Sequence, residues 1–305
     1  MNLRDKKILV TGGAGFLGQH VVNTLKKRGV IEDNIFVPRS KQFDLRKKEN
    51  CAVVVRGQDV VIHLAGTTGG ITFHKEHPAQ TFYDNLIMGA ELMETARIEG
   101  VEKFVTIGSA AEYPEHAPLP FKEEDVWIGS PEEIHTPYAI AKKMLLVEAQ
   151  SYRKQYDFRA IHLFMANMYG PGDYRSSFVL PMLMKRILAA EEQKTGFIEV
   201  WGTGKATRDF LYVEDAAEGI VLATEKYDSL EPINIASGEE ISIRKAVEML
   251  SRLMNFKGEI RWDATKPDGQ LRRILDASRA EKEFGFKAST DFETGIKKML
   301  QSYHA

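Results

Sequence analysis

Short apolar runs rich in β-branched residues alternate with amphipathic stretches along the first half of the chain. The apolar runs predict strands at 7–11, 34–37, 59–64, 103–107 and 159–164. The longer stretches between them predict helices at 15–28, 78–97 and 136–155. Strand–helix–strand units with almost wholly apolar strands are typical of a parallel sheet covered by helices on both faces. The pattern therefore predicts an α/β fold, a Rossmann-type doubly wound parallel sheet.

The alternation becomes irregular beyond about residue 165. Helices are still predicted at 178–191, 242–254 and 291–302, with short strands near 197–200, 210–213 and 233–235. We assign residues 1–167, together with about 212–237, to the sheet domain. Residues 168–211 and 238–305 are assigned to a smaller mixed α/β lobe, which we expect over the carboxyl edge of the sheet, where open α/β sheets bind ligands.

Composition narrows the class of protein. Of the 305 residues, 43% are hydrophobic and 28% charged, which is ordinary globular usage and excludes a disordered or collagenous chain. The 41 basic and 43 acidic residues nearly balance, so no nucleic-acid partner is expected. The single cysteine, Cys51, excludes an intramolecular disulfide. We see no apolar run of about 18 residues and no apolar signal segment, so we expect a cytoplasmic protein without a membrane partner.

A glycine-rich loop lies between the first predicted strand and the first predicted helix. Gly12, Gly15 and Gly18 have the G-x-x-G-x-x-G spacing, with Phe16 and Leu17 in the first helical turn. Glycines allow a tight turn and close approach of a pyrophosphate, and the helix N-terminus offers free N–H groups. The strand before the loop and the helix after it are the context that this motif requires. The loop predicts a dinucleotide site.

The segment after the second predicted strand bears on which dinucleotide binds. An NAD site usually carries an acid about 20 residues after the loop, which binds the ribose hydroxyls. Arg39, Ser40 and Lys41 stand there instead. Two cations and a hydroxyl suit a 2′-phosphate, so we predict NADP as the cofactor. NAD remains the alternative, in which the two cations are ordinary solvated loop residues.

Tyr138 and Lys142 are four residues apart at the start of a predicted helix, so both lie on one helical face. A nearby ammonium is expected to lower the pKa of the phenol and make Tyr138 a proton donor or acceptor. Ser109 follows the predicted strand 103–107 and is expected at the ligand-binding edge of the sheet. Each residue alone is a common feature of α/β proteins, but together with the glycine loop they predict a catalytic site.

This set of residues resembles the extended short-chain dehydrogenase/reductase family, which acts on nucleotide-diphosphate sugars. Further resemblances run along the whole chain. His63-Leu64-Ala65-Gly66 is similar to the family's strand-four signature, which implies that Leu64, Ala65 and Gly66 contact the cofactor. The run 167–172 resembles its substrate-contacting N-x-Y-G-P turn, and 208–215 its R-D-[FY]-[LI]-x-V-x-D segment. The resemblance implies that Asn167 contacts substrate and Arg208 its diphosphate.

Within the family, the chain most resembles the GDP-L-fucose synthases. The resemblance is carried by Gly69-Gly70-Ile71, Pro137 to Lys142, Trp201 to Gly204, and Lys266-Pro267-Asp268-Gly269. It implies NADPH, a GDP-sugar, and substrate contacts by Trp201 and Lys266. It also implies a homodimer formed through a four-helix bundle of the helices 78–97 and 136–155.

Departures from that subgroup narrow the expected reaction. Fucose synthases invert C3 and C5 with a Cys and a His, and the matching positions hold Ala111 and Phe178. Neither side chain can move a proton. Sugar dehydratases carry acids directly after the catalytic Ser or Thr, whereas Glu112 comes one position late and reaches the site only through a local bulge.

These departures do not affect the residues expected to support hydride transfer at C4. We therefore predict an NADPH-dependent 4-ketoreductase of a nucleotide 4-keto-6-deoxysugar, with Ser109, Tyr138 and Lys142 as catalytic residues. The alternatives are an NAD-dependent nucleotide-sugar 4-epimerase and a non-catalytic NADP-binding sensor or scaffold. No metal site is predicted, because His74 and His77 lack further ligands at suitable spacing.

Overall fold

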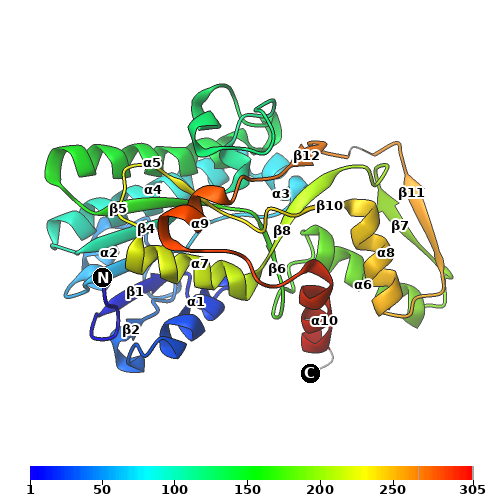
Figure 1. The fold of residues 1–305 in the computed structure, drawn as a ribbon, viewed down its shortest axis with the longest axis horizontal. Helices are drawn as coiled ribbons and strands as arrows, with labels where there is room; N and C mark the ends of the chain where they lie inside the picture. Colours follow the sequence, from blue (N-terminus) through cyan, green and yellow to red (C-terminus); the bar gives the residue numbers. More distant parts are fainter. Residues whose placement is uncertain (267, 304–305) are drawn as a thin grey trace.

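A six-stranded parallel sheet forms the larger part of the molecule (Figure 1). The computed structural model describes residues 1–266 and 268–303. The strand order is β2-β1-β3-β4-β5-β9. Strand β2 adds on one side of β1 and β3 on the other, so the order of the strands reverses between β1 and β3. The strands are β1 (Ile8–Thr11), β2 (Ile35–Phe36), β3 (Val60–His63), β4 (Lys103–Ile107), β5 (Ala160–Met165) and β9 (Ile233–Ile235). The prediction of a doubly wound parallel sheet is confirmed.

Successive rows of paired residues send their side chains to opposite faces of this sheet. One row belongs to the core beneath α1 (Phe16–Lys27), α7 (Val213–Lys226) and α9 (Ser278–Phe284), and consists of Val10, Ile62, Val105 and Ile161. The next row belongs to the core beneath α2 (Lys48–Val55), α4 (Pro78–Ile98) and α5 (Thr136–Tyr156), and consists of Leu9, Val61, Phe104 and Ala160. Because both faces are covered, the strands are mostly apolar.

The smaller lobe is mixed α/β and lies beside the carboxyl edge of the sheet, on the right in Figure 1. Strands β10 (Glu240–Ser242), β8 (Thr207–Tyr212) and β12 (Arg272–Arg273) form a sheet to which β6 (Asn167–Tyr169) adds by pairing with β8. Strands β7 (Phe197–Trp201) and β11 (Glu259–Asp263) form a separate parallel pair. Helices α6 (Val179–Glu192), α8 (Ile243–Leu253) and α10 (Phe292–Tyr303) enclose its own apolar core.

The chain returns from the lobe to the sheet domain near its end. Leu275, Ala280, Phe284 and Phe286 are buried in the core of the large sheet, although the sequence placed the whole of 238–305 with the lobe. Asn234 in β9 helps to hold the returning segment in place. Its side-chain amide donates hydrogen bonds to the carbonyl oxygens of Phe121 and Asp276, both at 3.0 Å. These bonds hold the segment after β12 against the last strand of the large sheet.

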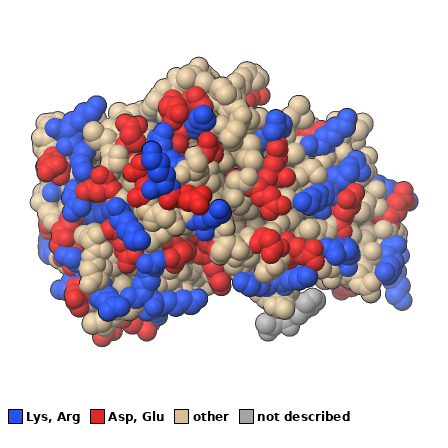
Figure 2. Space-filling model, viewed as in Figure 1, with Lys and Arg blue, Asp and Glu red and all other residues tan. Residues whose placement is uncertain are grey.

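Short helices complete the edge that faces the lobe. They are α3 (Ile71–Glu76), η2 (Ala110–Glu112), η3 (Glu123–Trp127) and η4 (Glu133–His135), whereas η1 (Glu32–Asn34) precedes β2 at the opposite edge of the sheet. In the face drawn in Figure 2, acidic and basic side chains are interspersed over both parts of the molecule. No helix among the described residues is long and apolar enough to cross a membrane.

Candidate active site

Two adjoining cavities lie where the sheet meets the lobe. The first, of about 300 Å³, is lined by the glycine loop, Ser109, Tyr138 and Lys142. The second, of about 400 Å³, reaches into the lobe along β6, β7 and β8. Residues that line both cavities include Gly69, His135, Asn167, Phe178 and Arg273. The structure thus brings the predicted catalytic residues together beside a separate space for a second ligand.

The glycine loop packs too closely for larger residues. A Cβ on Gly12, whose φ is +66°, would lie 2.8 Å from the backbone N of Ala65, and one on Gly18 would lie 2.2 Å from the carbonyl O of Gly12. Helix α1 begins after Gly15 with no side-chain cap. The free N–H groups of its first turn border the first cavity, together with Phe16 and Leu17. This geometry is compatible with the predicted anion site, which stays a prediction for the residues of the loop.

Lys142 supplies a buried cation on the opposite wall of the same cavity. Its side chain is 4% exposed, and its ammonium has no hydrogen-bond partner among the described residues. Burial lowers the pKa of Lys142 to about 8, against the opposing charge of Glu112. A buried donor without a partner fits a ligand with hydroxyl groups, as a nicotinamide ribose has. Together with the uncapped helix, it shows that this chain's residues fit a dinucleotide.

Ser109 and Tyr138 face the first cavity from β4 and α5. The Ser109 Oγ accepts the N–H of Ala111 at 3.2 Å, which leaves its hydroxyl proton free for a ligand. Burial raises the pKa of the Tyr138 phenol well above its ordinary value; the charge of Glu112 adds to the rise, and a hydrogen bond with Thr68 opposes it. The lowered pKa expected from Lys142 is wrong for this chain without a ligand, because burial and the carboxylate of Glu112 raise the pKa of the phenol.

Glu112 does not reach the cavity as a dehydratase acid would. The chain turns after Ser109 into η2, which buries Glu112 completely. Its Oε1 accepts the Ser109 N–H at 2.7 Å, and its Oε2 lies 3.2 Å from Nε2 of His162. The bulge that would have brought Glu112 to a substrate is absent from this part of the chain. Ala111 and Phe178, in contrast, do line the cavity.

The second cavity holds most of the predicted substrate residues. Arg208, Asn167 and Trp201 line it. The Nη1 of Arg208 donates to the carbonyl oxygens of Thr207 and Gln270, both at 2.7 Å, and burial lowers the pKa of Arg208 to about 10. These bonds orient a half-buried guanidinium toward the cavity, where a diphosphate would compensate its charge.

Two predicted groups lie apart from these cavities. Lys266 is exposed, with its ammonium 5.8 Å from the centroid of the Trp201 ring, and Pro267 of the same motif lies outside the described residues. The loop 39–41 follows β2 on the surface. The side chains of Arg39 and Lys41 have no ion pair within the described ranges and remain predictions for the 2′-phosphate.

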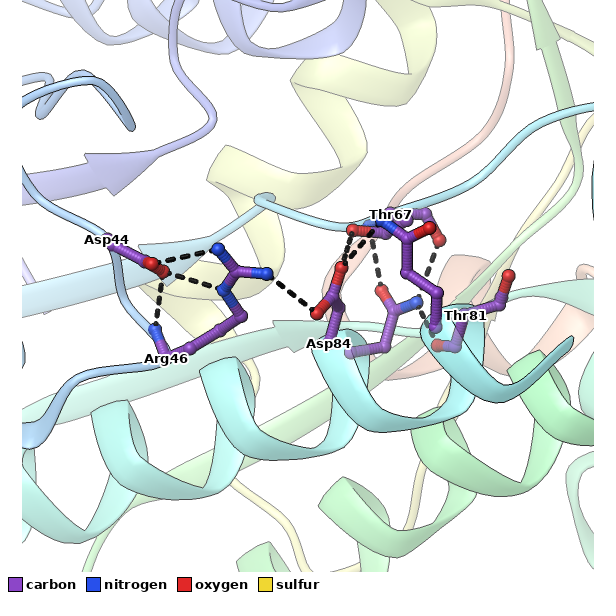
Figure 3. Close-up of polar contacts among 7 residues, drawn as sticks. Asp44, Arg46, Thr67, Thr81 and Asp84 are labelled. Atoms are coloured by element: carbon purple, nitrogen blue, oxygen red, sulfur yellow. Dashed lines mark hydrogen bonds and ion pairs between the residues drawn. The ribbon is translucent and has the colours of Figure 1, made fainter. Parts of the chain in front are cut away.

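A polar network secures the loop that follows residues 39–41. The Arg46 guanidinium joins Asp44, at 2.8 and 2.9 Å, to Asp84 of α4, at 3.1 Å (Figure 3). Arg46 holds the pKa of Asp44 at about 2. Thr67, after β3, donates to Asp84 at 3.2 Å. The network links the segments that follow β2 and β3 to α4, and so fixes the border of the predicted dinucleotide site.

Sequence reasoning missed Arg273 and His135, which border both cavities. Arg273 is 8% exposed and donates from Nη2 to Glu132 Oε2 at 2.9 Å. The same oxygen lies 2.9 Å from Nδ1 of His135. The His135 ring packs on His74, which in turn packs on Tyr138 with ring centroids 5.1 and 5.4 Å apart. The nearness of His135 to Tyr138 in the sequence was the available signal; nothing in the sequence set Arg273 apart from Arg272.

Comparisons with known proteins agree with this geometry. A GDP-L-fucose synthase from Sinorhizobium fredii is 35% identical over 99% of this chain and 96% of its own. A GDP-mannoheptose C4 reductase from Campylobacter jejuni, solved with NADP bound, has a TM-score of 0.90 at 27% identity, covering 99% of each chain. A GDP-6-OMe-4-keto-L-xylo-heptose reductase from C. jejuni has a TM-score of 0.91 at 25% identity, covering 99% of this chain and 98% of its own.

The sequence also matches a family model over most of its length. The model describes the NAD dependent epimerase/dehydratase family and matches residues 8–236, from β1 to the end of the large sheet. The resemblance to the extended short-chain dehydrogenases/reductases is thereby confirmed, and so is the expectation of an NAD(P)-dependent nucleotide-sugar enzyme. This chain belongs to the NAD-dependent epimerase/dehydratase family.

Proposed function

We propose that this enzyme is an NADPH-dependent 4-ketoreductase of a GDP-activated 4-keto-6-deoxysugar. The observation that carries the proposal is the composition of the first cavity. Ser109, Tyr138 and Lys142 are assembled there, whereas Ala111 and Phe178 fill the positions from which C3 and C5 would be epimerised. Such a site can move a proton at the C4 oxygen and has no acid–base pair at those two positions.

Each of the three residues has a defined role in the proposed reduction. When bound, NADPH supplies the hydride that reduces C4. Tyr138 donates the proton to the C4 oxygen, for which its raised pKa keeps it protonated at neutral pH. The free Ser109 hydroxyl proton hydrogen-bonds the same oxygen. Lys142 binds the ribose hydroxyls of the cofactor, and the cavity closes both ligands off from bulk water.

Substrate binding is assigned to the second cavity. The guanidinium groups of Arg208 and Arg273 hold the diphosphate, and Asn167 and Trp201 contact the sugar nucleotide. The names of the similar proteins support a GDP-sugar with a ketone at C4. Two of those proteins are named for heptoses. The similarity therefore supports the C4 ketone more strongly than any one substituent at C6.

The loop after β2 supports the choice of NADP over NAD. Arg39, Ser40 and Lys41 stand in place of the acid that binds the ribose of NAD. A structure similar over its full length is described with NADP bound. NADP(H) is therefore the proposed cofactor.

A homodimer is proposed through α4 and α5, which pack side by side. Both helices leave large apolar side chains exposed, namely Tyr83 at 57%, Phe82 at 37% and Val147 at 39%. A second copy of the same pair would cover them as a four-helix bundle. Light scattering on the wild type and on Tyr83→Arg tests this, because a dimer that the variant leaves intact would contradict the proposed face.

The function is tested by identifying the nucleotide that the purified protein releases and by titrating NADPH and NADH into the emptied enzyme. We expect preferential NADPH binding, followed by NADPH oxidation on addition of GDP-4-keto-6-deoxymannose or a GDP-4-keto-heptose. Tightly held NAD⁺ with interconversion of 4-epimers would instead establish a 4-epimerase. Binding of NADPH without turnover of any keto sugar would establish a sensor or scaffold.

A further inference from the structure

Arg175, in the loop between β6 and α6, is a cation that the proposed reduction does not use. It lines the first cavity but not the second. The charged side chains of the first cavity are Lys142, Arg175 and Arg273, and no Asp or Glu is among the described residues that line it. Lys142 is assigned to the cofactor ribose, and Arg273 borders both cavities. Arg175 is thus a positive charge of the first cavity for which a ligand is still to be named.

Two aromatic rings and a carboxylate hold the guanidinium of Arg175. Its Cζ lies 4.5 Å from the centroid of the Phe16 ring and 4.0 Å from that of the Phe178 ring. Nε and Nη2 donate to the two carboxylate oxygens of Asp173, at 2.7 and 2.9 Å, and the Asp173 side chain is 1% exposed. Nη1 has no hydrogen-bond partner among the described residues. The guanidinium is therefore oriented in advance, with one donor group free for a ligand.

Phe16 connects this cation to the glycine loop. It is the first residue of α1, directly after Gly15, and its side chain lines the same cavity. One turn further along α1, the Nε2 of His20 lies 3.0 Å from the carbonyl oxygen of Pro171. The loop from the lobe thus contacts α1 at two points, and Arg175 lies against the first turn, where the sequence predicts a bound diphosphate.

We propose that Arg175 binds the diphosphate of the dinucleotide cofactor from the side of the lobe. The inference rests on the proposed assignment of the first cavity to the cofactor. A ligand in this cavity is indicated independently by Lys142, whose buried ammonium has no partner among the described residues. A diphosphate can accept N–H groups from the first turn of α1 on one side and a charge-assisted hydrogen bond from Nη1 on the other. Arg208 lines only the second cavity, so each of the two predicted diphosphates has an arginine of its own.

The first test measures binding and needs no sugar substrate. Arg175→Ala should weaken NADPH binding about tenfold, as for the loss of one charged hydrogen bond. Displacement of NADPH then separates two fragments of the cofactor. 2′-Phospho-ADP-ribose carries the diphosphate and should lose the same factor, whereas adenosine 2′-monophosphate lacks it and should bind as it does to the wild type. A general disturbance of the site would weaken both fragments.

Two further variants separate charge from packing. Arg175→Gln keeps a side chain between the rings and an amide for Asp173 but removes the charge, so it should lose as much NADPH affinity as Arg175→Ala. Arg261→Ala is the matched control and should bind NADPH like the wild type. Arg261 also stacks on a phenylalanine, Phe197 at 3.9 Å, and also pairs with the acid two residues before it, Glu259 at 2.8 Å, but it lines neither cavity.

Three results would overturn the inference. They are wild-type NADPH affinity in a folded Arg175→Gln, equal losses for the two fragments, and a loss of affinity for GDP in place of NADPH, which would assign Arg175 to the substrate. If the wild type binds NADPH but reduces no 4-keto sugar, the proposed function fails, and the titrations still decide the role of Arg175. If the bound nucleotide is NAD⁺, the same comparison is made with NADH, ADP-ribose and adenosine, because both dinucleotides contain the diphosphate.

Discussion

Replacing Gly18 by alanine tests how the loop makes its anion site. The added Cβ would lie 2.2 Å from the Gly12 carbonyl O and 2.5 Å from the Gly13 Cα, both backbone atoms that cannot swing aside. Helix and loop must separate by about 1 Å, and overpacking of this kind typically costs about 1–3 kcal/mol. The same displacement misaligns N–H groups whose bonds to a charged phosphate are each worth about 1.5–3 kcal/mol. Gly18→Ala should therefore lower Tm by several degrees and weaken NADPH binding by at least about tenfold.

Gly15→Ala is the matched variant for this experiment. Gly15 has an ordinary extended backbone with φ −79°. Its added Cβ would approach the Gly12 O no closer than 3.2 Å and would meet no other atom within 4 Å beyond the adjoining residues. We expect Tm within about 1 °C of the wild type but weaker NADPH binding, because Gly15 lines the cavity. Melting curves and fluorescence titrations measure both quantities. Wild-type NADPH affinity in Gly18→Ala would refute the reasoning.

Three further predictions concern single groups. Tyr138→Phe should lower kcat at least about 100-fold with NADPH affinity nearly unchanged, and full turnover of this variant would remove the proton-donor role. The double variant Arg39→Ala with Lys41→Ala should raise the Kd for NADPH about 10- to 100-fold and leave that for NADH unchanged; equal losses for both nucleotides would contradict a 2′-phosphate site. Glu240, ion-paired with an arginine of β12, has its pKa lowered to about 2. Its contribution to stability is present above about pH 4.5 and lost as the pH falls toward 2, so urea unfolding of Glu240→Gln should depend less on pH in that window than the wild type.

The sequence could predict those strands and helices that a pattern of neighbouring residues specifies. Apolar β-branched runs and a glycine loop specified β1, β3, β4 and β5 to within about one residue. Helix α7 was missed because ten of its fourteen residues are buried, so only a narrow polar face with Glu214, Glu218 and Glu225 marks its period. The return of 275–286 to the sheet domain was also missed, because it depends on contacts with α7 and β9 that lie far away in the sequence.

The sequence could likewise bring Ser109, Tyr138 and Lys142 to one cavity, because each follows from a strand end or a helical spacing. The electrostatics of the site were not. The alternation rule placed Glu112 on the wrong face of a continuing strand, but a tight turn after Ser109 buries it beside His162 instead. The pKa of Tyr138 then depends on a three-dimensional balance of burial, the charge of Glu112 and a hydrogen bond with Thr68. Arg273 enters the site through the pairing of β12 with β8, which no local pattern indicates.

The central claim, hydride transfer to C4 without epimerisation, is tested most directly by isotope tracing. GDP-4-keto-6-deoxymannose is converted once with NADPH deuterated at the transferred position and once with unlabelled NADPH in D₂O, and each product is examined by NMR. The account predicts one deuterium at C4 for each NADP⁺ formed in the first reaction, and no enzyme-dependent deuterium at C3 or C5 in the second. Solvent deuterium at C3 or C5, or a C4 epimer formed without NADP⁺, would contradict it.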